Sequence, residues 1–156
     1  LYVGRIRIEK GIFSLVNLIK NRKNILLTII GAEKETTYSI NQSNVKIKPT
    51  QHNKIKLIKS YDDHDIFVLP SFTEGHPMVL LEALARRRPV IIFEEIKHVI
   101  GDKKGIFVSK RNFLSFQSTL NQIKKNYKNI QKEMRKNKLP TNKDFIDTLE
   151  RYIIGY

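Results

Sequence analysis

The 156-residue chain contains no cysteine, which excludes disulfide bonds and cysteine-ligated zinc sites and is typical of a reducing cytoplasm. It has no apolar stretch of the roughly 20 residues needed to cross a bilayer. It also lacks internal repeats and low-complexity segments. With 40% apolar residues, it is expected to form one globular domain over 1–156. The sequence starts at Leu1, without a methionine or a signal peptide, so we expect it to be a piece of a longer protein.

Positive charge is in large excess: 29 Lys and Arg against 15 Asp and Glu give a formal net charge of +14. Two explanations stay open. The lysines are spread along the whole chain, as a biased composition would produce, which favours an ordinary solvated surface. The other explanation is an anionic partner, with phosphate as the first candidate. Aromatic residues do not alternate with the charges as in single-strand nucleic-acid platforms, so nucleic acid is not the expected partner.

Short apolar runs alternate with longer stretches that are compatible with helices. The runs are nearly continuous in Val, Ile and Leu, as in strands that are covered on both faces. Strands are expected at 1–3, 25–30, 45–47, 66–69, 90–93 and 106–108, and helices at 11–20, 33–42, 52–60, 77–86, 94–100, 113–138 and 143–154. This order predicts an α/β fold: a Rossmann-like open parallel sheet of about six strands with helices on both faces.

The turn after the first expected strand carries Arg5 and Lys10 beside the start of a helix. It matches neither the Walker motif nor the G-x-G-x-x-G fingerprint. Backbone N–H groups at a helix N-terminus, together with two cations, can bind a diphosphate. Arg supplies a planar pair of donors there, and Lys supplies a mobile point charge. The alternative is that both are ordinary exposed surface charges.

Two carboxylates flank the turn between the strand at 66–69 and the helix at 77–86. Glu74 lies in the loop, and Glu82 lies within the helix. Open parallel sheets bind ligands at the carboxyl ends of their strands, so this turn is a candidate site. Glu82 can accept both hydroxyls of a ribose, or it can pair with Arg86 one turn later. Glu74 is either a ligand contact or a solvated loop acid.

Together these segments resemble the C-terminal, donor-binding domain of a family 4 glycosyltransferase with the GT-B fold. The matching segments follow the family's order along nearly the whole chain: 2–5, 9–11, 27–31, 65–71, 74–83, 89–91 and 104–108. The resemblance implies a retaining glycosyltransferase of the hexosyltransferase type that uses a nucleotide-diphospho-sugar, with no cofactor and no required metal. It implies a cytoplasmic enzyme, or one peripheral on the inner face of the membrane, in bacterial surface polysaccharide or lipopolysaccharide synthesis.

The resemblance also implies roles for single residues. The counterparts of Arg5 and Lys10 hold the donor diphosphate and stabilise the leaving group, that of Glu82 binds the ribose, and that of Glu74 reaches the donor sugar. Without a metal, cations and helix dipoles must carry the charge that develops on the diphosphate. The expected catalytic residues are Glu74, Arg5 and Lys10, and the expected donor-binding residues are Gly4, Arg5, Lys10, Glu74, Gly75, His76, Pro77, Met78 and Glu82.

Three features depart from the family pattern. The sequence Arg86-Arg87-Arg88 precedes Pro89 where the family commonly has Gly, and a left-handed conformation at Arg87 would cost roughly 1 kcal/mol. This triplet is either a charged helix end or an interaction surface. The loop after the strand at 90–93 is shortened, and His76 either contacts the donor or fills its own loop.

The acceptor-binding N-terminal domain of such an enzyme is not expected within this chain, which should bind donor weakly and catalyse little by itself. The expected partners are the donor, that missing domain and a saccharide or lipid-linked acceptor, and contacts to the base are expected from 31–34 and 48–52. The alternative function is a non-catalytic basic module for nucleic acid or anionic membrane. Its affinity would fall steeply with salt and would not depend on Glu74 or Glu82.

Overall fold

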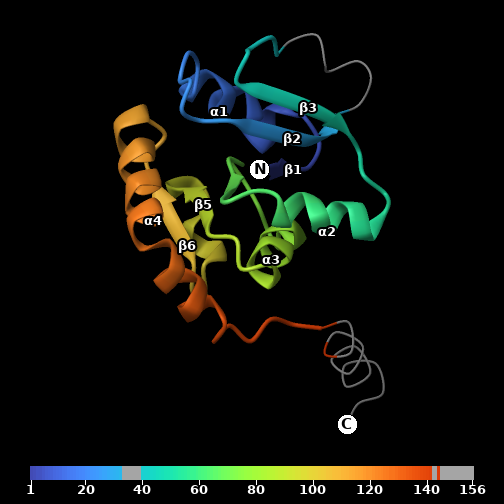
Figure 1. Cartoon of the computed structure of the whole chain (residues 1–156), viewed down its shortest axis with the longest axis vertical. Helices are drawn as coiled ribbons and strands as arrows, with labels where there is room; N and C mark the ends of the chain where they lie inside the picture. Colours follow the sequence, from blue (N-terminus) through green and yellow to red (C-terminus); the bar gives the residue numbers. More distant parts are fainter. Residues whose placement is uncertain (33–39, 142–143, 145–156) are drawn as a thin grey trace.

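Within the part of the chain that the structure describes, six short strands, all paired in parallel, run through the centre of the molecule (Figure 1). The structure is a computed structural model that describes residues 1–32, 40–141 and 144. The strands are β1 (Tyr2–Val3), β2 (Leu27–Ala32), β3 (Val45–Pro49), β4 (Phe67–Leu69), β5 (Val90–Phe93) and β6 (Ile106–Ser109). They form two three-stranded sheets, in the orders β1-β2-β3 and β4-β5-β6. All six lie where the sequence predicts them.

The two sheets meet at β1 and β4. The main-chain nitrogen of Leu1 donates to the Ile66 carbonyl at 2.9 Å, and the Val68 N–H donates to the Leu1 carbonyl at 2.9 Å. These two bonds have the pattern of a parallel pair, so the strands follow one another as β3-β2-β1-β4-β5-β6. This is the order of doubly wound folds, in which ligands bind where the order reverses, here between β1 and β4. The predicted six-stranded sheet is therefore two sheets with a narrow join.

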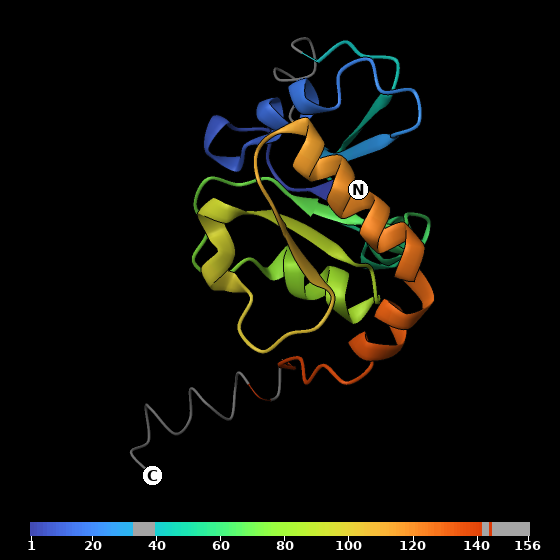
Figure 2. The same ribbon diagram turned by 90° about the vertical axis from the view of Figure 1, so that its left-hand side faces the viewer.

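Helices cover both faces of the strands, as predicted. They are α1 (Ile12–Leu18), α2 (Lys54–Asp62), α3 (Met78–Ala85) and α4 (Phe113–Met134), with 3-10 turns η1 (Ile8–Lys10) and η3 (Glu94–Val99). Side chains of α1 and α4 share one apolar cluster with Val68 and Ile91, whereas α2 and α3 share the other with Phe67 and Ile92. Successive residues of β4 and β5 thus point into opposite apolar clusters. Both faces of these strands are buried, which explains why their sequences do not alternate apolar with polar residues. Figure 2 shows α4 running across one face of the strands.

Several expected helices differ in kind or extent. The helix expected at 94–100 is the 3-10 turn η3, and that expected at 113–138 ends at Met134. Of the expected helices at 33–42 and 143–154, residues 33–39, 142–143 and 145–154 lie outside the described part of the chain. Thr141 and Asp144 exchange the hydrogen bonds of a capping box, with Thr141 N 2.6 Å from Asp144 Oδ2 and Asp144 N 3.2 Å from Thr141 Oγ1. Across the described residues, no helix combines the length and apolar character that a membrane crossing requires.

Helix α3 ends at Ala85, and Arg87 has a φ of 54°, the left-handed conformation considered for it from the sequence. The N–H of Arg88 donates to Ala83 O and that of Arg87 to Leu84 O, both at 2.9 Å. This pair of bonds defines a Schellman termination, in which glycine is the usual left-handed residue. Arg86 binds both carboxylate oxygens of Asp62, at 2.9 and 2.5 Å, and Arg88 lies 3.6 Å from the same group. The arginine triplet is therefore a charged helix end anchored to the end of α2.

Candidate functional site

The loops that follow β1 and β4 pack directly against each other at the point where the strand order reverses. Gly11 has a φ of 65°, and a Cβ added there would lie 1.9 Å from the Pro70 carbonyl oxygen. The Phe72 N–H donates to the Glu9 carbonyl at 3.0 Å. A left-handed backbone and this close approach both require glycine at position 11. The contact brings the loop with Arg5 and Lys10 beside the loop with Glu74.

Lys10 and Glu74, which are separated by 64 residues, form an ion pair. The Lys10 Nζ lies 2.7 Å from Glu74 Oε1, and their side chains are 27% and 10% exposed. The Ser71 hydroxyl donates to the same oxygen at 2.7 Å, and His98 Nε2 donates to the Glu74 carbonyl at 2.7 Å. Within the described residues, Glu74 Oε2 accepts no hydrogen bond. The carboxylate is therefore held through one oxygen while the other is available to a ligand.

Glu82 lies on the buried side of the same region, on α3. Its Oε2 accepts a 2.7 Å hydrogen bond from the hydroxyl of Tyr61, a buried residue of α2. Burial, and then the hydrogen bond to Glu82, raise the pKa of Tyr61, so the phenol stays a proton donor. The alternative pair of Glu82 with Arg86 does not form, because Arg86 binds Asp62. Glu82 too has one oxygen held and, within the described part, one without a partner.

Arg5 lies at the exposed edge of this region, on a loop fixed from beneath. The Tyr2 hydroxyl donates to the Arg5 carbonyl at 2.8 Å, and the Gly4 N–H donates to Ile30 O at 2.9 Å. Burial, followed by the charge of Glu74, raises the pKa of Tyr2, so this phenol also stays protonated. Gly31 on β2 has a φ of 122°, and a Cβ there would lie 2.4 Å from Gly4 O. The neighbouring backbones thus hold the Arg5 loop in place.

Helices α1 and α3 both begin at this edge of the sheets. Within the described residues, neither has a side-chain cap, and neither carries an acidic residue in its first turn. Their first N–H groups therefore present partial positive charge without a competing carboxylate. Gly75, in the approach to α3, has open space where a Cβ would stand, and His76 and Met78 are exposed. The edge is chemically suited to an anion.

The structure brings Lys10 and Glu74 into contact, with Arg5 and the segment from Gly75 to Met78 on flanking loops. Glu82 lies on α3, where its carboxylate contacts Tyr61 of α2. In the described structure no direct contact joins Glu82 to Lys10 or Arg5. Sequence reasoning missed four side chains that hold the site: Tyr61, Ser71, His98 and Arg111. Tyr61, His98 and Arg111 act across 21 to 41 residues, so local spacing carries no signal for them.

A separate hollow of about 340 Å³ lies between β3 and α2. It is lined by Ile30, Lys48, Pro49, Gln51, Lys56, Lys59, Ser60 and Asp63. None of the candidate catalytic residues lines it, but Lys48 to Gln51 fall in the segment expected to contact a base. Among the described residues, no group of three or more His, Asp or Glu side chains is arranged to hold a metal ion.

Comparison with known proteins identifies the family. Residues 1–139 match the family model described as glycosyl transferases group 1. The chain belongs to this family. As a group 1 glycosyl transferase it is 31% identical over 136 residues to the capsular polysaccharide biosynthesis glycosyltransferase CapM of Staphylococcus aureus. That match covers 78% of the chain and 35% of CapM.

A second relative is the putative teichuronic acid biosynthesis glycosyltransferase TuaC of Bacillus subtilis, with 34% identity over 117 residues. That match covers 73% of this group 1 chain and 28% of TuaC. The chain thus spans about a third of the length of these curated relatives.

A solved structure identifies which part of such enzymes the fold resembles. It is the C-terminal domain of the group 1 family protein LpcC from Francisella tularensis, matched with a TM-score of 0.61 and 18% identity. The match covers 87% of this chain and 80% of that domain. The fold of this group 1 chain is therefore that of the C-terminal domain of a GT-B glycosyltransferase.

Proposed function

We propose that this chain is the donor-binding domain of a retaining hexosyltransferase that takes a sugar from a nucleotide-diphospho-sugar. The observation that carries the proposal is the Lys10–Glu74 pair, 2.7 Å apart where the strand order reverses. A cation and a carboxylate side by side suit a ligand that has an anionic diphosphate next to a polar sugar. The proposal also agrees with the family match over residues 1–139.

In this proposal the diphosphate lies over the starts of α1 and α3, beside Lys10 and Arg5. These cations and the helix N-termini stabilise the negative charge that develops on the leaving nucleoside diphosphate. The chain's own cations, rather than a metal or another cofactor, carry that charge. Main-chain groups from Gly75 to Met78 face the sugar and the phosphates.

The carboxylates of Glu74 and Glu82 are proposed to bind the sugar and the ribose of the donor, respectively. Glu74 Oε1 is taken by Lys10 and Ser71, so Oε2 is the atom proposed to reach the sugar hydroxyls. Glu82 Oε2 is taken by Tyr61, so Oε1 is proposed to accept from the ribose. The hollow between β3 and α2, which Lys48 and Gln51 help to line, is the proposed place of the base.

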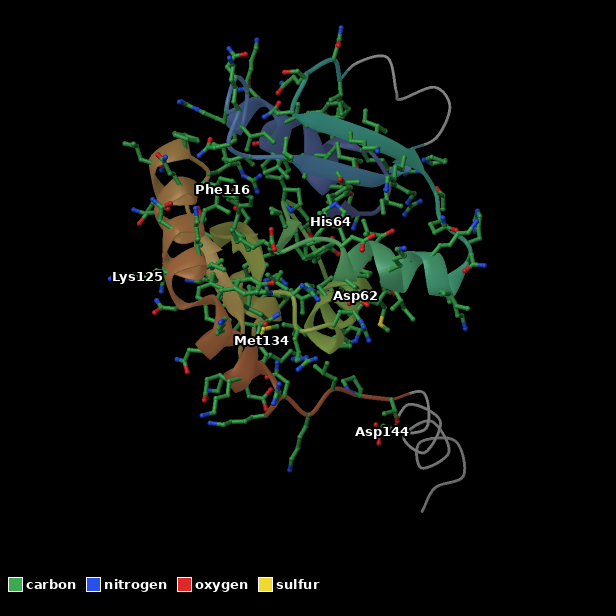
Figure 3. The ribbon with its side chains drawn as sticks, in the orientation of Figure 1. Asp62, His64, Phe116, Lys125, Met134 and Asp144 are labelled. Atoms are coloured by element: carbon green, nitrogen blue, oxygen red, sulfur yellow. The ribbon has the colours of Figure 1, made fainter. Side chains whose placement is uncertain are left out.

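The names of the relatives support a role in bacterial surface polysaccharide synthesis, as part of a longer enzyme whose other domain binds the acceptor. We further propose a peripheral contact with the inner face of the membrane through α4. From Lys124 to Lys138 the chain carries seven Lys and Arg against one acid, Glu133. Figure 3 shows Lys125 on the outer side of α4, pointing away from the sheets. Binding to anionic vesicles that falls with rising salt is the expected result.

Calorimetry with UDP, GDP and ADP tests the donor proposal. One of them is expected to bind, and Glu82→Ala or Arg5→Ala is expected to weaken that binding tenfold or more, the scale of one charge-assisted contact. Glu133→Ala and Arg135→Ala, at the far end of α4, serve as matched controls. Absence of binding by all three nucleotides contradicts the proposal. Binding that is indifferent to Glu82 and falls only with salt would favour the basic module instead.

A further inference from the structure

Arg111 reaches the loop that carries Glu74 from a distant part of the chain. It lies between β6 and α4, and its side chain is 16% exposed. Its Nη1 donates to the Pro70 carbonyl at 3.0 Å and its Nη2 to the Ser71 carbonyl at 3.4 Å. One guanidinium therefore fixes two successive carbonyls at the start of the 70–74 loop.

The guanidinium is itself held in a single orientation. Its Nε lies 2.8 Å from Glu95 Oε1, and its carbon lies 4.1 Å from the ring centre of Phe72 and 4.3 Å from that of Phe93. A planar, delocalised cation can stack on rings and donate along its edge at the same time, which lysine cannot do. A Cβ on Gly11 would stand 3.3 Å from Nη1, so the group also packs against the loop from β1.

We propose that Arg111 is the positioning residue for Glu74. The chain of contacts is short: Arg111 fixes the Pro70 and Ser71 carbonyls, and the Ser71 hydroxyl in turn holds Glu74 Oε1 at 2.7 Å. The held carboxylate then presents Oε2 to the donor sugar. Arg111 itself does not touch the donor. This inference rests on the proposed function, because it assigns Arg111 a role through the sugar contact of Glu74.

In the described structure the guanidinium of Arg111 binds Glu95 and two main-chain carbonyls, and not Lys10 or Arg5, which are proposed to bind the diphosphate. Loss of Arg111 should therefore leave the attraction for the diphosphate nearly unchanged and should disturb the placement of Glu74. A residue that only braced the fold would lower stability without changing how the chain distinguishes a nucleotide-sugar from its bare nucleotide. This difference separates positioning from simple bracing.

The test compares Arg111→Gln and Arg111→Lys with wild type, using UDP with UDP-glucose, GDP with GDP-mannose and ADP with ADP-glucose. For the pair that wild type binds, Arg111→Gln is expected to weaken the nucleotide-sugar fivefold or more and the bare nucleotide less than twofold. Arg111→Lys keeps the cation beside Glu95 but cannot hold both carbonyls, so an intermediate loss is expected. Arg22→Gln removes a guanidinium that stacks on Phe113 at 3.8 Å and is the matched control, with no change expected.

A second measurement keeps the inference separate from the proposed function. Amide NMR signals of Ser71 to Gly75 are expected to shift in both Arg111 variants and to stay in place in Arg22→Gln. If wild type binds none of the nucleotides, the proposed function fails and the role in sugar binding fails with it, whatever the NMR shows. If nucleotides bind but a folded Arg111→Gln keeps the wild-type ratio, or loses both ligands equally, the positioning role alone is overturned. Should Arg111→Gln not fold, Arg111→Lys decides by the same ratio.

Discussion

Replacing Glu74 by glutamine is expected to raise the affinity for a bare nucleoside diphosphate about tenfold. In the free chain Lys10 is bound to Glu74, with 2.7 Å between Nζ and Oε1. A diphosphate must share this cation with the carboxylate or take it away. Glutamine keeps the shape and the hydrogen bond from Ser71 but removes the competing charge, so the anion gains full use of Lys10.

The magnitude follows from the geometry of the pair. Two unit charges about 4 Å apart interact by about 1 kcal/mol in water and by about 4 kcal/mol at an effective dielectric constant of 20. The Lys10 side chain is 27% exposed, which moves the interaction towards the water limit. About 1.4 kcal/mol, or a factor of ten in affinity, is therefore expected.

Calorimetry of wild type and Glu74→Gln with the best-bound nucleoside diphosphate measures this effect. Glu133→Gln is the matched control, because it removes the same charge at the far end of α4. With the corresponding nucleotide-sugar, the gain at the diphosphate is offset by the lost sugar contact, so the ratio of the two affinities should fall. The reasoning is refuted if Glu74→Gln, folded and compared with its control, binds the bare nucleotide no more tightly than wild type.

Three further predictions concern stability. Arg87→Gly relieves a left-handed residue with a φ of 54° and should raise the unfolding free energy by about 1 kcal/mol in denaturant titrations; no gain would mean that the backbone is unstrained. Gly11→Ala places a Cβ 1.9 Å from Pro70 O and should cost about 3 kcal/mol or more, whereas a loss below about 1 kcal/mol would contradict the close contact. Burial lowers the pKa of His64, whose Nε2 lies 2.8 Å from Thr28 Oγ1, below the ordinary 6.5. The unfolded chain then binds the proton more readily, so stability should fall as the pH drops below 6.5, and His64→Gln should flatten that dependence in melts across pH.

The sequence predicts β4 and β5 well because both are continuous apolar runs that are buried on both faces, whereas β3 alternates Val45 and Ile47 with lysines. The resemblance singles out the arginine triplet, where the family commonly has Gly before the proline, and the structure gives Arg87 there a positive φ of 54°. The sequence does not determine the strand order. Once the structure places β1 beside β4, the neighbourhood of Lys10 and Glu74 follows, because the carboxyl ends of parallel strands share one edge.

The side chains that hold the site could not be predicted in the same way. Arg111 and Pro70 are 41 residues apart, and Tyr61 and Glu82 are 21 apart. Such contacts depend on how helices and loops pack against the sheets, and no local sequence pattern determines that packing. The pairing of the main chain of Leu1 with that of Ile66 is equally hidden, because the two residues are 65 apart in the sequence.

The narrow join between the two sheets has a consequence for how the chain unfolds. Leu1, directly before β1, donates to Ile66 O and accepts from the Val68 N–H of β4, and the Lys10–Glu74 pair lies at the end of the same join. A ligand bound there contacts loops from both three-stranded sheets and stabilises their association. Amide exchange in β2 and in β5 should then slow together on ligand binding, although neither strand touches the ligand. Filling the site would strengthen the coupling between two sheets that already share both apolar clusters, so that they open as one cooperative unit.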